Sequence, residues 1–255
     1  DAMRIREFMP EVQAAEAPPE LEINYRARPL PADSASFREW STMLSLADAD
    51  YPVPLQLRRA VDYVFSRSID VGRYDFYITD DSSYNLDRRV IIPFTWRGDI
   101  IGYTARALEE GIRPKYFNSH EPNYVFNMDR QLPDAKFVIV TEGPFDAMAV
   151  DGVAILGSDV SETQADVIES LGREVIVVPD WDQHQDRNGR WVWPGRKLID
   201  HALEYGWSVS FPIWRDTEAK DVGDAVVQYG KLFTIKSILD GAERNPVKIK
   251  LKSKL

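Results

Sequence analysis

Residues 137–150 read FVIVTEGPFDAMAV, in which an apolar, β-branched run is followed by Glu142-Gly143 and then by Pro144. A short continuous apolar run is typical of a strand that is buried on both faces. Proline is favoured at the first position of a helix, because the N–H that it lacks would go unpaired there. The segment therefore predicts a strand over 137–141, a helix from about residue 144, and Glu142 in the turn between them.

The alternation of apolar strand and helix continues to about residue 230. Further strands are expected at VAIL (153–156), EVIVV (174–178) and WSVSFPI (207–213), and further helices at 161–171, 194–205 and 222–229. Repeated units of this kind predict an α/β fold, with a Rossmann-like parallel sheet that helices cover on both faces. In such sheets the functional groups gather at the carboxyl ends of the strands.

Acidic residues follow three of the four predicted strands. Glu142 follows the first, Asp180 and Asp182 follow the third, and Asp221 and Asp224 come a short loop after the fourth. If the first and third strands are neighbours, Glu142, Asp180 and Asp182 converge at one edge of the sheet. Carboxylates suit Mg²⁺, and two such ions can activate an attacking hydroxyl and stabilise a leaving pyrophosphate. Each carboxylate alone could be a helix cap, so the prediction of a metal site depends on their convergence.

The chain upstream of this α/β unit has a different pattern. Residues 1–33 include a proline-rich stretch without periodicity, which predicts a linker or an extended arm. Residues 34–133 predict a mixed lobe of helices and strands, so the whole chain is expected to be α+β. Its helices are expected from Ser34 or Ser36 to about Leu46 and from Pro54, and its strands at 75–79, 89–95 and 100–105. The α/β unit then occupies residues 134–240, and the lysine-rich residues 241–255 predict a basic C-terminal tail.

Two acidic motifs resemble those of the TOPRIM domain, which occurs in primases, topoisomerases, recombination proteins and some nucleases. TEGPFDAMAV, with Glu142, Gly143 and Asp146, is similar to the first motif, and VVPDWDQ, with Asp180 and Asp182, is similar to the second. The resemblance implies that Glu142 acts as a general acid or base and that Asp180 and Asp182 are metal ligands. Asp146 lies four residues after Glu142, so it would face the same side, or serve only as a first-turn acid.

The flanking segments resemble the RNA-polymerase core of bacterial- or phage-type primases. They are AVDYVFSRSID (60–70), DRRVIIPFTWRGDIIGYTARAL (87–108), RPKYFNSHE (113–121), GVAILGSDVSETQADVI (152–168) and AKDVGDAVVQYG (219–230). The resemblance runs from about residue 55 to 235 and implies template-directed synthesis of short RNA primers on single-stranded DNA from ribonucleoside triphosphates. It also implies two or more Mg²⁺ ions, with Mn²⁺ as the alternative, and a replicative helicase as a partner.

The same resemblance indicates residues of the upstream lobe that would bind nucleotide or template. The candidates are Arg88, Arg89, Arg106, Lys115, Tyr116 and Asn118. Cationic side chains would hold phosphates, and the tyrosine would stack on a base. Two alternatives stay open: Arg88 and Arg89 could protect an edge strand, and Tyr116 could be part of the core.

The sequence departs from the primase pattern in two places. Residues 183–194, QHQDRNGRWVWP, are an insertion between Asp182 and Gly195, and they predict either a flap near the metals or surface elaboration. Asp221 and Asp224 stand three apart where the family has two acids two apart, which favours Asp221 over Asp224 as a ligand. A TOPRIM nuclease and a non-catalytic module that binds single-stranded DNA or a helicase remain alternative functions.

Composition sets the outer limits. The 255 residues carry a net charge of −10, which argues mildly against a generic nucleic-acid binder. There is no cysteine, so disulfides, thiolate zinc sites and a cysteine nucleophile are excluded. No apolar run is long enough to span a bilayer, and we expect a cytoplasmic protein, in the host cytoplasm if a phage encodes it.

Overall fold

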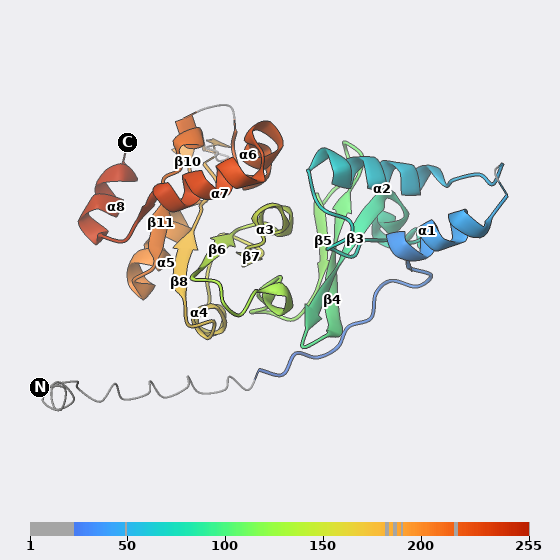
Figure 1. The fold of residues 1–255 in the computed structure, drawn as a ribbon, viewed down its shortest axis with the longest axis horizontal. Helices are drawn as coiled ribbons and strands as arrows, with labels where there is room; N and C mark the ends of the chain where they lie inside the picture. The colour runs from blue at the N-terminus through green and yellow to red at the C-terminus, as the bar shows by residue number, and fades with distance from the viewer. Residues whose placement is uncertain are drawn as a thin grey trace, which may run out of the picture.

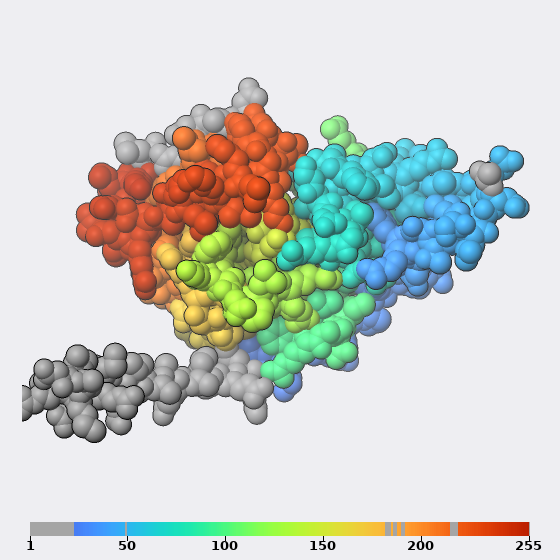
Figure 2. All heavy atoms as spheres, in the orientation of Figure 1, coloured from blue at the N-terminus to red at the C-terminus, as the bar shows by residue number. Residues whose placement is uncertain are grey.

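The computed structural model describes residues 23–48, 50–181, 184–185, 188–189, 191–216 and 219–254. The chain folds into two lobes that lie side by side (Figure 1). The N-terminal lobe is coloured blue to green and the C-terminal lobe yellow-green to red, and the two are in contact across the middle of the molecule (Figure 2). The mixed α/β architecture that the sequence predicted is confirmed.

The N-terminal lobe is built on an antiparallel sheet in the order β1-β2-β3-β4-β5. Its strands are β1 (Ala35–Ser36), β2 (Tyr77–Ile78), β3 (Arg89–Trp96), β4 (Asp99–Ala107) and β5 (Tyr116–Ser119), its helices are α1 (Phe37–Leu46) and α2 (Leu55–Ser66), and two 3₁₀ helices cover Ser83–Arg88 and Met128–Arg130. The strands expected at 89–95 and 100–105 are confirmed as β3 and β4, which pair along their length as a hairpin. Gly98 in its turn has a φ of +87°, which glycine adopts without a steric penalty.

The two helices of this lobe differ in how firmly they pack. α1 begins with a capping box, in which Ser36 accepts the N–H of Glu39 and the Glu39 carboxylate accepts the N–H of Ser36. None of its side chains is fully buried, and it protrudes at the right end of the molecule (Figure 1). α2, in contrast, buries Leu57 and Val64. That packing fixes Arg67, which directly follows α2, beside the C-terminal lobe.

The C-terminal lobe contains a second sheet in the order β12-β11-β8-β6-β7. Its strands are β6 (Phe137–Thr141), β7 (Val153–Ala154), β8 (Glu174–Val177), β11 (Ser208–Ser210) and β12 (Ala242–Glu243), and β9 (His184–Gln185) and β10 (Trp191–Val192) form a separate small hairpin. β6, β7, β8 and β11 are parallel, and β6 and β8 are neighbours, as the convergence of their acidic residues requires. β12 pairs antiparallel with β11, so the sheet is mixed rather than purely parallel.

Helices cover both faces of this second sheet, as predicted. They are α3 (Pro144–Val150), α4 (Glu162–Glu169), α5 (Arg196–Tyr205), α6 (Val222–Tyr229), α7 (Lys231–Asp240) and α8 (Pro246–Lys252), with a 3₁₀ helix at Ile213–Asp216. Successive strand residues point to opposite faces. Ile139 therefore joins the core that contains α3, α6 and α7, and Val140 joins the core that contains α4, α5 and α8. Among the described residues, no helix combines the length and the apolar character needed to cross a membrane.

The core that contains α3, α6 and α7 extends into the N-terminal lobe. Phe145 of α3 meets Tyr63 of α2 edge to face, with 5.4 Å between ring centroids, and lies parallel to Phe76 at 6.4 Å. Phe145 is only 5% exposed. Because α3 starts directly after Glu142-Gly143, the packing that joins the lobes also holds this turn in place.

The prediction of a basic tail is wrong for residues 242–252, which contain β12 and α8. Asn245 caps α8 by accepting the N–H groups of Val247 and Lys248, and Ile249 is fully buried in the C-terminal core. The cap and the burial of Ile249 favour a packed helix in this lysine-rich segment, and Lys248 and Lys252 also lie 3.8 and 3.7 Å from the Glu243 carboxylate.

The N-terminal arm lies against the body of the protein where it is described. Residues 23–33 contain no helix or strand, but the Tyr25 ring lies edge-on to Trp96 at 5.2 Å and its hydroxyl donates to the Asn123 carbonyl. Residues 1–22 of the predicted linker lie outside the described residues.

Candidate functional site

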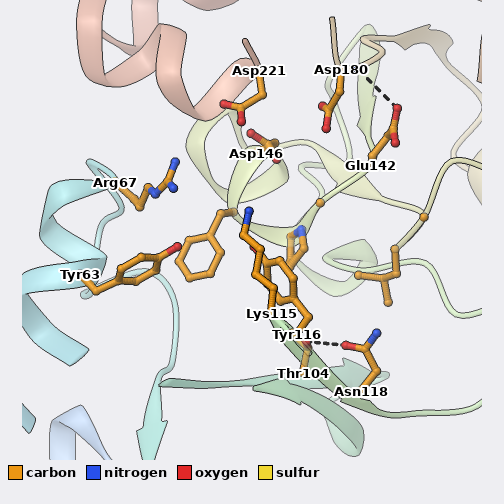
Figure 3. A pocket seen from close by; sticks show the side chains of 15 residues that line it. Tyr63, Arg67, Thr104, Lys115, Tyr116, Asn118, Glu142, Asp146, Asp180 and Asp221 are labelled. Atoms are coloured by element: carbon orange, nitrogen blue, oxygen red, sulfur yellow. Dashed lines mark hydrogen bonds between the residues drawn. The ribbon is translucent and has the colours of Figure 1, made fainter. Parts of the chain in front are cut away.

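A cavity of about 270 Å³ lies between the lobes, at the carboxyl edge of the parallel strands. Its polar lining residues are Tyr63, Arg67, Thr104, Lys115, Tyr116, Asn118, Glu142, Asp146, Asp180 and Asp221. Figure 3 shows the four acidic side chains on the wall that the C-terminal lobe supplies, and the cationic and aromatic side chains on the opposite wall. Neither lobe alone supplies both walls.

The pairing of β6 with β8 assembles the acidic wall. Val140 pairs with Val177 in parallel register, so both strands end at the same edge of the sheet. Glu142 and Asp180 follow at that edge, and the backbone N–H of Asp180 donates to the Glu142 carboxylate at an N···O distance of 3.4 Å. The strand order thus brings these two predicted residues together.

Asp146 and Asp221 add a second pair of carboxyl groups. Asp146 lies in the first turn of α3 and accepts the backbone N–H of Gly223 at 2.8 Å. Asp221 caps α6 and accepts the backbone N–H of Asp224 at 2.7 Å. Burial, reinforced by the neighbouring Asp221 carboxylate, raises the pKa of Asp146 to about 7, and burial also raises the pKa of Asp221. Two half-buried carboxylates side by side are unfavourable at neutral pH unless a cation compensates them.

The opposite wall carries positive charge and an aromatic ring. The Arg67 guanidinium lies over the Tyr63 ring at 5.6 Å, and its Nη1 is 3.3 Å from Asp224 Oδ1. The Lys115 ammonium lies 6.0 Å from the centroid of the Tyr116 ring. Burial raises the pKa of Tyr116 well above its usual range, so its hydroxyl stays protonated and can donate a hydrogen bond. This wall can therefore receive an anionic group.

Arg67 is a site residue that the sequence analysis missed. It comes from the segment 60–70, which carried the family resemblance, but its arginine was not singled out there. The available signal was an arginine directly after an amphipathic helix. Only the packing of α2 against the other lobe brings it to the acidic cluster.

Two further predicted ligands, Asp224 and Asp182, are not found among the lining residues that the structure describes. Asp224 does not line the cavity but pairs with Arg67, so of the two acids at the start of α6 it is Asp221 that faces the site. Asp182 lies outside the described residues, so its place in the site remains the prediction made from the Asp-x-Asp motif.

Two predicted phosphate-binding arginines lie elsewhere in the N-terminal lobe. Arg88 is on the surface and forms an ion pair with Glu109. Arg89 is 0% exposed, and its guanidinium donates to the carbonyl groups of Tyr84 and Ala105. The prediction that Arg89 binds nucleotide or template is therefore wrong, because this side chain has no surface to offer. It is a buried cross-link between backbone segments.

Arg106 supports the site from behind. Its guanidinium lies between the rings of Tyr63 and Tyr116, at 5.4 and 5.0 Å from their centroids. It is not among the described residues that line the cavity. Asn118, in contrast, does line it, and its Oδ1 accepts a hydrogen bond from the Thr104 hydroxyl at 2.6 Å (Figure 3).

The donor chemistry of the acidic wall fits a hard divalent cation. All the acidic groups offer oxygen ligands, which Mg²⁺ and Mn²⁺ prefer. The described residues hold no preformed group of three or more acidic or histidine side chains at ligand distances. The observation in favour of a cation is that the half-buried Asp146 and Asp221 line the same cavity as Glu142 and Asp180: burial raises the pKa of Asp146 and Asp221, and a bound cation would offset the charge of their ionised forms.

Comparison with known proteins finds primases that are similar in sequence or in fold. No family model matches the chain. A curated DNA primase from Aquifex aeolicus is 25% identical over 163 residues, which cover 56% of this chain and 30% of that protein. A solved DnaG primase catalytic domain, bound to single-stranded DNA, matches with a TM-score of 0.57 and 18% identity over 84% of this chain and 80% of its own.

A second solved structure gives the same result. The RNA polymerase domain of Mycobacterium tuberculosis DnaG, in complex with double-stranded DNA with a 6-nucleotide overhang, matches with a TM-score of 0.59 and 16% identity. The match covers 83% of this chain and 79% of that one. The chain has the fold of the DnaG primase catalytic core, which confirms the expected resemblance at the level of fold.

Proposed function

We propose that this chain is the RNA-polymerase core of a primase, which synthesises short RNA primers on single-stranded DNA by metal-dependent nucleotidyl transfer. The observation that carries the proposal is the cavity between the lobes, where four acidic side chains face Arg67 and Lys115. The primase-core fold and the curated primase relative support it. The aligned segment spans less than a third of that relative, so the activity is inferred for the core alone.

The acidic side chains would bind the metal ions, and one of them would also transfer a proton. Glu142, Asp180 and Asp182 would hold Mg²⁺ or Mn²⁺, and Asp146 and Asp221 would complete a site for two or more ions. Bound ions of this kind make a 3′-hydroxyl a better nucleophile and stabilise a departing pyrophosphate. Glu142 would also take the proton of the attacking hydroxyl; its position in the cavity lining, next to Asp180, supports this role.

The opposite wall would bind and orient the nucleotide. Lys115 and Arg67 line the same cavity of about 270 Å³ as the carboxylates and supply positive charge for a triphosphate. Tyr116 offers its ring face to a base and its protonated hydroxyl as a donor. Asn118 would fix a sugar or a base edge, held in place by Thr104.

The partners follow from this assignment. The template would be single-stranded DNA and the substrates ribonucleoside triphosphates, and a replicative helicase would bring the core to its template. The net charge of −10 is compatible with this, because the bound metal ions offset the carboxylates that contribute to it. A protein with this role would work in the cytoplasm, or in the host cytoplasm if encoded by a phage.

Two alternatives use the same residues differently. A TOPRIM nuclease would share the acidic wall, but it would not need the N-terminal lobe that supplies Lys115 and Tyr116. A non-catalytic module for binding single-stranded DNA or a helicase would not need four carboxyl groups in the lining of one cavity. Both observations favour the primase.

A template assay tests the proposal. Purified protein is incubated with single-stranded DNA, one labelled ribonucleotide among four, and Mg²⁺ or Mn²⁺. We expect short labelled RNA that disappears in Glu142→Gln. Template cleavage without synthesis would establish the nuclease, and DNA binding with neither reaction would establish the binding module.

A further inference from the structure

The insertion after the Asp-x-Asp motif returns to the loop from which it departs. The indole N–H of Trp193, near the end of the insertion, donates to the backbone carbonyl of Asp180 at 2.6 Å. Gly195 follows so closely that a Cβ there would lie 2.5 Å from the same carbonyl oxygen. The absence of a side chain at Gly195 is therefore what lets the insertion close on Asp180.

Aromatic stacking reinforces this hydrogen bond. The Trp193 ring stacks on Trp181, the residue between the two aspartates, with 5.0 Å between centroids and 26° between planes. Trp181 in turn lies against Phe211 at 5.7 Å. Stacked aromatic pairs at such distances contribute beyond the area they bury. Trp193 thus contacts the acidic loop through its ring face and through its N–H.

The other bonds of this loop lead to the rest of the acidic wall. The N–H of Asp180 donates to the Glu142 carboxylate, and the N–H of Trp181 donates to the carbonyl of Lys220, directly before Asp221. The Asp180 carbonyl is held by Trp193. The peptide group before Asp180 is thus held by Glu142, and the peptide group after it is held by Lys220 at its N–H and by Trp193 at its carbonyl oxygen.

We infer that Trp193 is a positioning residue for the metal site. Through its hydrogen bond to the Asp180 carbonyl, Trp193 holds the backbone of Asp180 so that the Asp180 carboxylate faces the ions. The end of the insertion that carries Trp193 therefore supports the site. The inference rests on the proposed metal-binding role of Asp180. Losing one hydrogen bond between neutral groups corresponds to a roughly 3- to 10-fold change in an equilibrium constant. We therefore expect metal affinity to fall by that factor when the indole N–H is removed.

The test is Trp193→Phe, which keeps a ring on Trp181 but removes the N–H donor. Trp207→Phe is the matched control, because its indole N–H also donates to an oxygen, Glu169 Oε1 at 2.9 Å, at the opposite, amino-terminal edge of the sheet. Mn²⁺ binding is measured by electron paramagnetic resonance of the free ion, and melting temperatures establish that both variants are folded. RNA synthesis is then measured across a Mn²⁺ titration.

We expect Trp193→Phe to bind Mn²⁺ about 3- to 10-fold more weakly, with synthesis restored at saturating Mn²⁺ and with Trp207→Phe like the parent protein. Equal Mn²⁺ affinity in Trp193→Phe and the parent would overturn the inference, and so would an equal loss in both variants. If the parent makes no RNA but Trp193→Phe still weakens Mn²⁺ binding, the positioning role stands and the proposed polymerase activity fails.

Discussion

Replacing Asp146 by asparagine should stabilise the metal-free protein, although Asp146 lies in the candidate active site. The carboxyl group is only partly accessible on the cavity wall, next to Asp221, and its pKa is raised from the ordinary 3.8 to about 7. A carboxyl group whose pKa is higher in the folded state favours folding below about pH 4, and that contribution is lost as the pH rises through 7. At pH 8 the parent protein therefore carries a buried charge that Arg67 and the Gly223 N–H offset only in part, and a neutral asparagine side chain would remove it. Asparagine also keeps the oxygen that accepts the Gly223 N–H.

The size of the effect follows from the same values. The difference between 3.8 and about 7 corresponds to ~4 kcal/mol of unfavourable interaction at high pH. Water in the cavity screens part of this, and we take about half, ~2 kcal/mol. Losing a negative charge from the first turn of α3 costs about 0.5 kcal/mol through the helix dipole. The expected net gain is on the order of 1 kcal/mol at pH 8 in EDTA.

Urea unfolding followed by circular dichroism measures this gain. At pH 8 in EDTA, Asp146→Asn should be more stable than the parent; at pH 4.5, where Asp146 is already protonated in the folded protein, the two should be nearly equal. Mg²⁺ should stabilise the parent more than the variant. Asp134→Asn, an exposed residue before β6, is the control. A variant that is less stable than the parent at pH 8 without metal would refute the reasoning.

Three further predictions concern the two walls and the core. Glu142→Gln should lower RNA synthesis by at least ~100-fold, because it removes the general base. Binding of single-stranded DNA, measured by fluorescence anisotropy, should stay within about twofold of the parent. A loss of DNA binding as large as the loss of synthesis would contradict a role in the chemical step. Arg67→Ala and Lys115→Ala should each raise the KM for ribonucleotides, measured in steady-state assays, by roughly 10- to 100-fold, as expected for a lost charge-assisted contact to phosphate. An unchanged KM in either variant would show that the substituted residue does not bind the nucleotide. Arg89→Ala should destabilise the protein by about 3 kcal/mol in urea unfolding, because it removes a fully buried side chain and its hydrogen bonds to the carbonyl groups of Tyr84 and Ala105. Arg88→Ala should leave the melting temperature unchanged, and equal effects of the two substitutions would show that Arg89 is not the buried cross-link.

The strand–helix units from residue 137 onward could be predicted because the signal is local. The strand at 137–141 and the helices that begin at Pro144 and Val222 lie where the apolar runs, the proline and the capping Asp221 indicate. α7 and the folded segment around α8 could not be predicted in this way. α8 buries only Ile249, and α7 buries Thr234, Ser237 and Ile238, so neither shows the long apolar face that a periodic pattern reveals.

The arginines show where prediction of the site from sequence stops. Arg88 and Arg89 are adjacent and chemically identical, yet one is exposed and the other is enclosed by backbone carbonyl groups. Arg88 ends the 3₁₀ helix at Ser83–Arg88 and Arg89 begins β3, so only the tertiary packing around this junction decides which one is buried. Arg67 was missed for the complementary reason, since its partner Asp224 is distant in sequence.

The sequence by itself determined the α/β unit, the identity of the carboxylates and the edge of the sheet where they gather. These depend on short-range patterns and on the rule that parallel strands end together. The tertiary structure decided which side chains oppose them: Arg67, Lys115 and Tyr116 face the acidic wall because Phe145 and Tyr63 pack the two lobes together. It also decided that Trp193 closes the insertion on Asp180. Contacts between distant segments depend on packing geometry, and a local sequence pattern carries no record of that geometry.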